Sequence, residues 1–233
     1  MSEKGKLYGI GVGPGDVELL TLKAARILKT VPVICSPKSA KEKDSIALSI
    51  VEPIIDERED SNKVMLVEPI FPMIENDEQL EKVWDSAAEL IAHYLDSGRD
   101  VAFVTLGDPS VFSTFSYVQK RLKEKYEVEV IPGITAFTAC AAACEIPIVE
   151  KNQVLTIVPK IDDRLEEIMN YSDSIVLMKA SRNTKELEEL IESKNKEKII
   201  CSVENCTREN EKIIDGFSED KPYLTTTLIK FTE

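Results

Sequence analysis

The chain has few basic residues, and this scarcity narrows the range of partners. It carries 29 Lys and Arg against 42 Asp and Glu, which gives a formal net charge of −13 over 233 residues. No basic stripe is present that could release counterions from a phosphate backbone. We therefore expect no nucleic-acid partner.

Long hydrophobic runs are also missing. No apolar stretch reaches the roughly 18 residues that a membrane span needs, although 43% of the residues are hydrophobic and suffice for one large or two small cores. The N-terminal residues show neither an apolar signal-peptide core nor a cleavage site. These features predict a cytoplasmic protein with no membrane partner.

Histidine is nearly absent, and the cysteines lack metal-binding spacing. The only histidine, His93, lies in a long polar helix pattern and is expected on its surface rather than as a general base. The cysteines form no Cys-x-x-Cys pair, and their odd number argues against a secreted disulfide framework. Cys140 and Cys144 share a helix face, but with no histidine nearby we expect no metal. We interpret all five cysteines as small buried side chains: Cys35, Cys140, Cys144, Cys201 and Cys206.

Glycine is scarce as well, yet it is concentrated in one place. Four of the nine glycines, at positions 9, 11, 13 and 15, lie in the segment that leads from a strand pattern over residues 7–12 to a helix pattern over residues 21–26. Glycine lets the backbone bend sharply and approach a ligand closely. The segment predicts a strand-to-helix turn of an α/β protein that binds a ligand, with a turn that binds nothing as the alternative.

The residues of this turn limit the kind of ligand. Counting from Gly9 or Gly11, the sixth position of a dinucleotide fingerprint holds Pro14 or Asp16 rather than glycine, and no Gly-Lys-Ser/Thr triplet follows. Pro14 removes an amide donor, and Asp16 and Glu18 place negative charge at the helix start. A phosphate is disfavoured, and a cationic ligand is not.

Strand and helix patterns alternate along the chain. The apolar run 101–105 is typical of a strand buried on both faces of a parallel sheet. A polar stretch near residues 124–129 predicts a domain boundary, which gives an N-terminal α/β domain over 1–125 and a C-terminal α/β domain over 126–233. The β-forming run 223–231 predicts an antiparallel strand that makes the second sheet mixed.

Two further loops follow predicted strands, where α/β proteins place ligands. Residues 106–112 contain Gly107 and the carboxylate of Asp108 directly after the buried strand, and residues 131–136 open a helix of small residues. A simple Gly-Asp-Pro turn and a closely packed helix are the alternatives that involve no ligand.

Together these segments resemble the tetrapyrrole methylase family, whose members are S-adenosylmethionine-dependent enzymes of the class III methyltransferase type. The resemblance is carried, in chain order, by Gly-x-Gly-Pro-Gly-Asp-x-x-Leu-Leu-Thr-Leu-Lys over 11–23, Gly-Asp-Pro over 107–109, Pro-Gly-Ile-Thr over 132–135 and Val-Glu-Asn-Cys-Thr over 203–207. Residues 71–73 and 108–117 resemble the C20-methyltransferases of cobalamin synthesis.

The resemblance implies two α/β domains with S-adenosyl-L-methionine in the cleft between them, a homodimer, and a tetrapyrrole such as precorrin-2 or cobalt-factor II as substrate. Asp108 becomes the candidate for the base that removes the C20 proton, with cofactor binding as its other possible role. Many members have glycine where this chain has Cys206. The implied cofactor contacts are Pro14, Leu106, Gly107, Asp108, Val111, Thr135, Ala136, Met178 and Cys206.

A substrate with many carboxylates conflicts with the acidity of the chain. Cations that follow predicted strands could offset the repulsion, and we expect them among Lys38, Lys160, Lys179 and Arg182.

Three alternatives to this function stay open. They are a class I methyltransferase, which lacks support because residues 34–37 hold no acidic residue, a relative acting on uroporphyrinogen III or a diphthamide precursor, and a ligand-sensing module without turnover.

Overall fold

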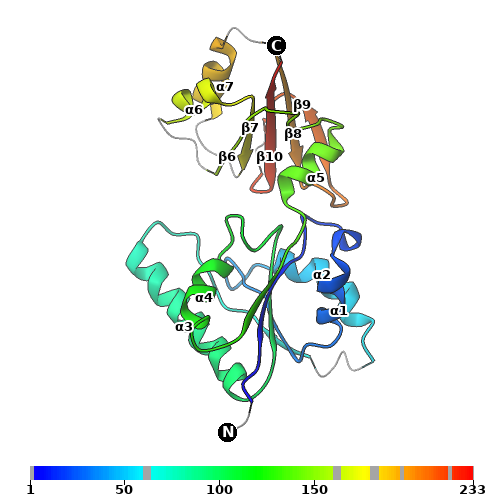
Figure 1. The fold of residues 1–233 in the computed structure, drawn as a ribbon, viewed down its shortest axis with the longest axis vertical. Coiled ribbons are helices and arrows are strands. Elements are labelled where there is room, and N and C mark those ends of the chain that lie inside the picture. Colours follow the sequence, from blue (N-terminus) through cyan, green and yellow to red (C-terminus); the bar gives the residue numbers. More distant parts are fainter. Residues whose placement is uncertain are drawn as a thin grey trace. The chain divides into compact units, whose positions relative to one another are not determined.

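The structure, a computed structural model, describes residues 3–59, 64–159, 164–178, 184–194, 197–219 and 222–232, and of 184–187 only the backbone. The chain divides into two compact units, Met1–Ile134 and Thr135–Glu233. Each unit contains one sheet with helices against it (Figure 1).

The first unit alternates strands and helices, as the sequence pattern predicts. A short 3₁₀ turn, Val17–Leu19, follows the first strand. The elements are β1 (Leu7–Gly11), α1 (Leu22–Leu28), β2 (Val33–Cys35), α2 (Ile46–Asp56), β3 (Met65–Val67), α3 (Asp77–Asp96), β4 (Val101–Thr105), α4 (Phe115–Leu122) and β5 (Val128–Ile131).

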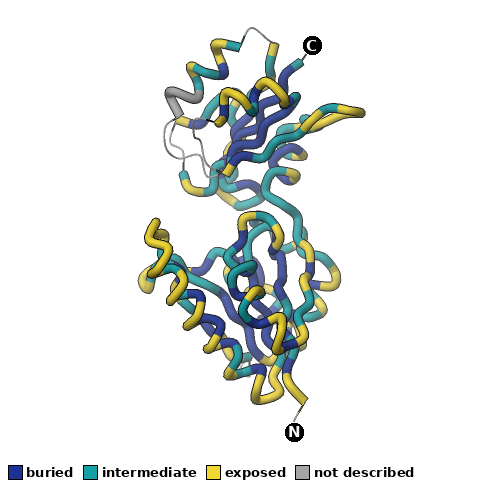
Figure 2. Tube along the Cα trace, turned by 60° about the vertical axis from the view of Figure 1, so that its left-hand side comes forward, coloured by how far each residue is buried: buried dark blue, intermediate teal, exposed yellow. Residues whose placement is uncertain are grey.

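All five strands of the first sheet are parallel, in the order β3-β2-β4-β1-β5. Helices α3 and α4 cover one face and α1 and α2 the other (Figure 1). The central strand β4 is apolar because both of its faces are covered, and Val101 to Val104 are fully buried. Figure 2 shows these strands as buried segments between helices whose outer faces are exposed.

The boundary between the units lies later than the sequence pattern indicates. We expected it after residue 125, but β5 pairs with β1, with Leu7 opposite Val128 and Ile10 opposite Ile131. The polar stretch before β5 is therefore a turn within the first unit, and the division follows Ile134.

The second unit is built on a mixed sheet in the order β6-β7-β10-β8-β9. Its final strand runs antiparallel to both β7 and β8, which confirms the expectation of a mixed sheet. Strand β9 was not predicted from the sequence, because it is a short edge strand with mostly exposed residues and no alternating apolar pattern. The elements are α5 (Ala136–Ala143), β6 (Leu155–Val158), α6 (Leu165–Tyr171), β7 (Ser174–Met178), α7 (Thr184–Ser193), β8 (Lys198–Glu204), β9 (Lys212–Asp215) and β10 (Thr225–Phe231).

Helices α6 and α7 lie on one side of the second sheet and α5 on the other (Figure 1). Among the described residues, no helix combines the length and the apolarity that crossing a bilayer requires.

Candidate cofactor site

Three glycine-containing loops meet in the first unit. They follow β1, β4 and β5, which are neighbours in the sheet, so parallel pairing brings their carboxyl ends to one edge. A Cβ on Gly11 would lie 2.6 Å from both the Gly107 carbonyl oxygen and the Gly133 nitrogen, and a Cβ on Gly133 would lie 2.2 Å from the Gly107 oxygen. The loops thus touch backbone to backbone, and only glycine fits at the two positions.

Hydrogen bonds fix this junction of Gly11, Gly107 and Gly133, which we call the glycine junction. Gly107 N donates to the Gly13 carbonyl at 2.8 Å, and Gly13 N donates to the Gly107 carbonyl at 3.3 Å. Gly133 N donates to Asp108 Oδ2 at 2.9 Å. The amides of Gly13, Gly107 and Gly133 are therefore occupied within the protein, and the adjacent Pro14 has none. An anion could not use these three amides without breaking bonds within the protein.

Asp108 connects two of the loops through its carboxylate. Its Oδ1 accepts hydrogen bonds from Ser110 N, at 2.8 Å, and from the Ser110 hydroxyl, while Oδ2 receives the Gly133 amide. Burial acts to raise the pKa of Asp108, but the hydrogen bonds from Ser110 and Gly133 outweigh it, so the pKa lies below its ordinary value. A carboxylate held in this way is a weak base and a strong structural link.

The loop that carries Asp108 also holds an aromatic residue in an uncommon conformation. Phe112 has φ of +48° and is exposed, although the left-handed region disfavours bulky side chains. The next residue is anchored inward, since Ser113 Oγ lies 2.9 Å from Thr105 Oγ1 and accepts the Phe115 amide at 3.2 Å. Backbone strain of this kind occurs frequently at ligand sites.

The cofactor contacts expected in the second unit lie on three segments. Met178 ends β7 and pairs with Thr226, while Glu204 ends β8 and pairs with Thr225. Because both strands run antiparallel to β10, Met178 and the loop that carries Cys206 lie at the same edge of this sheet. Thr135 and Ala136 open α5, where the Thr135 hydroxyl lies 2.9 Å from that of Thr138.

The loop after β8 has its own strained backbone. Asn205 and Thr207 both have positive φ, and Thr207 N donates to Glu211 Oε2 at 2.5 Å. The buried Cys206 thiol contacts Cys140 on α5 and also Glu211, and the contact with Cys140 together with burial raises its pKa. Cys206 is therefore packed against α5.

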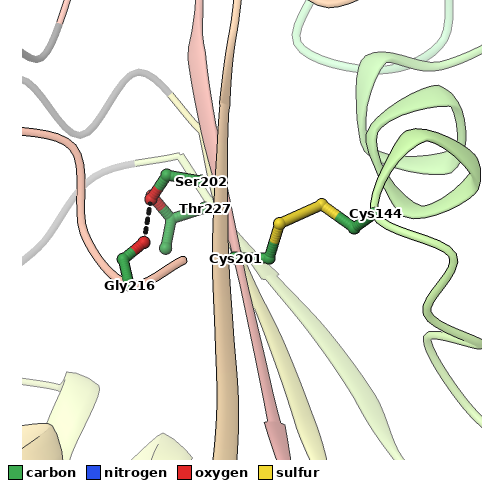
Figure 3. The surroundings of a disulfide bond; sticks show 5 residues. All are labelled: Cys144, Cys201, Ser202, Gly216 and Thr227. Atoms are coloured by element: carbon green, nitrogen blue, oxygen red, sulfur yellow. Dashed lines mark hydrogen bonds between the residues drawn. A yellow bond between two sulfur atoms is a disulfide. The ribbon is translucent and has the colours of Figure 1, made fainter. Parts of the chain in front are cut away.

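The cysteine prediction is right for three residues and wrong for two. Cys35, Cys140 and Cys206 are free and buried, whereas Cys144 and Cys201 form a disulfide (Figure 3). The interpretation failed because a separation of 57 residues gives no local signal of pairing. Within the described part of the chain, no three His, Cys, Asp or Glu side chains could hold a metal ion. His93 is exposed on α3, as expected.

Only one of the four cations expected near the substrate can be assessed. Lys38 Nζ lies 2.9 Å from Glu68 Oε1, so its charge is already paired. The other three, Lys160, Lys179 and Arg182, fall outside the described residues.

A family model named Tetrapyrrole (Corrin/Porphyrin) Methylases matches residues 6–221, which covers both units. The chain belongs to this family. A methylase of the family from Methanocaldococcus jannaschii, named "Probable cobalt-precorrin-2 C(20)-methyltransferase", is 41% identical over 97% of this chain and 96% of its own. A Salmonella typhimurium protein named "Cobalt-precorrin-2 C(20)-methyltransferase" is 34% identical over 75% of this chain and 73% of its own.

The fold of this tetrapyrrole methylase is also found among solved structures. The uroporphyrin-III C-methyltransferase of Thermus thermophilus, solved in complex with S-adenosyl homocysteine, matches with a TM-score of 0.67. The match covers 97% of both chains at 20% sequence identity, so it bears on the fold alone.

Sequence reasoning missed two features near the expected contacts. Nothing in a single sequence marks Phe112 as left-handed, because no glycine or asparagine stands there. The contact between Cys140 and Cys206 also leaves no signal in the sequence, because the two cysteines lie far apart along the chain.

Proposed function

We propose that this tetrapyrrole methylase transfers a methyl group from S-adenosylmethionine to C20 of a precorrin-2-type tetrapyrrole, either cobalt-factor II or precorrin-2, in cobalamin biosynthesis. The observation that carries the proposal is the 41% identity, over nearly the full length of both chains, to the archaeal relative with that printed name. The Salmonella relative, named for the same reaction, supports it independently.

The chemistry of the glycine junction supports the cofactor assignment. S-adenosylmethionine supplies a methyl group bound to a positively charged sulfur. A site for such a ligand needs close backbone approach and carbonyl or carboxylate oxygens rather than free amide donors. The junction offers close approach at Gly11 and Gly133, and the amides of Gly107 and Gly133 are already hydrogen-bonded.

We propose that residues of both units contact the cofactor. In the first unit the proposed contacts are Pro14, Leu106, Gly107 and Val111, which belong to the loops that follow β1 and β4. In the second unit they are Thr135, Ala136, Met178 and Cys206. Methyl transfer is a displacement that depends mainly on alignment, so the main contribution of these residues is to position the two reactants.

We propose that Asp108 serves this alignment and does not act as the base for the C20 proton. General-base catalysis is most effective when the pKa of the base lies near the working pH. The hydrogen bonds from Ser110 and Gly133 lower the pKa of Asp108 and use both of its oxygens. Its role is then to hold the loops after β4 and β5 together.

The finer assignments of assembly and location are also proposals. A homodimer in the cytoplasm fits the family resemblance and the acidic sequence. Light scattering coupled to size-exclusion chromatography measures the assembly directly, and a monomeric mass would contradict the dimer.

Mass spectrometry of the product tests the reaction. The protein is incubated with S-adenosylmethionine and, in separate reactions, cobalt-factor II, precorrin-2 and uroporphyrinogen III. We expect the first or the second acceptor to gain one methyl group, located at C20 by NMR with a carbon-13-labelled donor. Methylation of uroporphyrinogen III alone would assign a different substrate, and cofactor binding without product would indicate a sensing module.

A further inference from the structure

Helix α5 of the second unit has little of its own to hold it in place. It spans only eight residues, five of them alanine, and no side chain caps its N-terminus. Isolated helices shorter than about 12 residues are marginal in water, and alanine buries little apolar area. The apolar cluster that includes α6 and α7 lies on the opposite face of the sheet, and the buried residues of α5, on its own face, are the small side chains Ala139, Cys140 and Ala141. The attachment of α5 to the sheet therefore relies on small side chains and on the contacts that its cysteines make.

Sulfur atoms supply several of these contacts. Cys144, at the C-terminal end of α5, is bonded to Cys201 in the middle of β8. Figure 3 shows Cys201 pointing toward α5, while the next residue, Ser202, points to the opposite side and donates to the Gly216 carbonyl at 2.7 Å. One helical turn before Cys144, the buried Cys140 contacts the thiol of Cys206.

The two elements joined by the disulfide both lead into expected cofactor contacts. Helix α5 starts at Ala136, directly after Thr135, and β8 ends two residues before Cys206. A covalent link between the C-terminal end of α5 and the middle of β8 restricts how far the two elements that carry these contact segments can move apart within this unit.

We propose that the Cys144–Cys201 disulfide is a positioning bond for cofactor binding, and that its reduction lowers the affinity for S-adenosylmethionine. The proposal rests on the proposed function for the identity of the ligand. Cys144 and Cys201 are positioning residues, because they act through the placement of Thr135, Ala136 and Cys206.

The bond is accessible to a reductant from one side. Cys201 is buried, whereas Cys144 is partly exposed at the helix end. A thiolate of dithiothreitol attacks the Cys144 sulfur, and Cys201 leaves as a thiolate that takes up a proton. The second reagent thiol then attacks the mixed disulfide, which releases Cys144 and closes the cyclic oxidised reagent. Two electrons pass from the reagent to the protein.

The first measurement establishes the bond itself. Titration of thiols in denaturant without reductant should find three reactive thiols in the full chain, belonging to Cys35, Cys140 and Cys206. Five thiols in protein purified and assayed under air would overturn the proposal.

The second measurement compares cofactor affinity by calorimetry in oxidised and reduced protein. We expect reduction to weaken binding of S-adenosylmethionine by at least about fivefold, the lower end of typical coupling between sites. The Cys144→Ser/Cys201→Ser double variant should bind as weakly as the reduced protein and not respond to dithiothreitol. Reoxidation with oxidised glutathione should restore the affinity of the unmodified chain. The control variant Cys35→Ala, which changes a free cysteine of the first unit, should lose affinity on reduction as much as the unmodified chain does. Equal affinities in both states would refute the positioning role.

Two further readouts separate this proposal from the proposed function and from a general loss of stability. At saturating cofactor, turnover of the reduced protein should be retained, so the loss appears in the cofactor KM rather than in kcat. Hydrogen exchange of the α5 amides should accelerate when the disulfide is reduced. Unchanged exchange would show that the disulfide does not hold α5 in place, whether or not the cofactor binds. If the oxidised protein does not bind S-adenosylmethionine at all, the proposed function fails, while the exchange of α5 still decides whether the bond holds the helix.

Discussion

Replacement of Asp108 by asparagine separates a structural link from a catalytic base. The change keeps the shape of the side chain but removes its charge. The side-chain nitrogen of asparagine is a donor and would face either Ser110 N or Gly133 N, which are donors too, so one of these hydrogen bonds is lost. A hydrogen bond to a charged group contributes about 1.5–3 kcal/mol. We therefore expect Asp108→Asn to lower the free energy of unfolding of the first unit by about that amount and to weaken cofactor binding.

The pH dependence of this effect has a definite sign. The pKa of Asp108 is lowered in the folded protein, so its contribution to stability is fully present above the pKa of the unfolded chain, about 3.9. The contribution is lost as the pH falls through the lower folded value. The difference in stability between the two proteins should stay constant from neutral pH down to roughly pH 5 and shrink below about pH 4.

Urea unfolding followed by circular dichroism between about pH 3 and about pH 8 measures this difference, because the range extends below the pKa of about 3.9 of the unfolded chain. Asp16→Asn is the matched control, since Asp16 accepts the Glu18 amide at 2.8 Å in a neighbouring turn and asparagine can still accept it. We expect the control to change stability by less than about 0.5 kcal/mol. A thousandfold loss of kcat in Asp108→Asn, with stability and cofactor affinity unchanged, would show that Asp108 is the base after all.

Two other substitutions test the backbone geometry. Gly133→Ala places a Cβ 2.2 Å from the Gly107 oxygen. We expect the free energy of unfolding, measured in urea, to fall by about 1–3 kcal/mol or more, and cofactor binding to weaken. An unchanged stability would contradict the close contact of the loops. Glu145 follows α5 and is exposed with φ of +56°, a left-handed conformation that favours glycine. We therefore expect Glu145→Gly to raise the free energy of unfolding by about 0.5–1 kcal/mol in thermal unfolding, and an unchanged stability would contradict the left-handed strain.

Much of the fold could be predicted because local patterns determine it. The apolar run 101–105 indicates a doubly covered strand, and β4 has that position. The β-forming run near the end of the chain indicates a strand, and β10 pairs antiparallel on both sides. The boundary near residue 125 was misplaced because β5 pairs with β1, which lies more than 100 positions earlier in the chain. The local composition around residue 125 does not indicate such a distant pairing.

The convergence of the three loops could also be anticipated from the rule that carboxyl ends of parallel strands share an edge. The role of Asp108 could not, because its partner Gly133 lies 25 residues away and the hydrogen bond between them decides whether the carboxylate is available as a base. The same limit applies to Cys144 and Cys201. Their pairing depends on the packing of α5 against β8 and leaves no trace in the spacing of the cysteines.

The glycine junction explains why this α/β protein does not follow the dinucleotide-binding pattern despite its glycine-rich first turn. Dinucleotide and phosphate sites keep backbone amides free at the helix start, where they face the anion. Here the amides of Gly13, Gly107 and Gly133 are hydrogen-bonded to loop oxygens, one of them a carboxylate. A phosphate would have to displace those bonds and approach Asp108, whereas a ligand with a positive centre and no phosphate would not. The requirement for glycine at positions 11 and 133 thus comes from contact between loops, and the hydrogen bonds that this contact allows fit the proposed binding of a cofactor without phosphate.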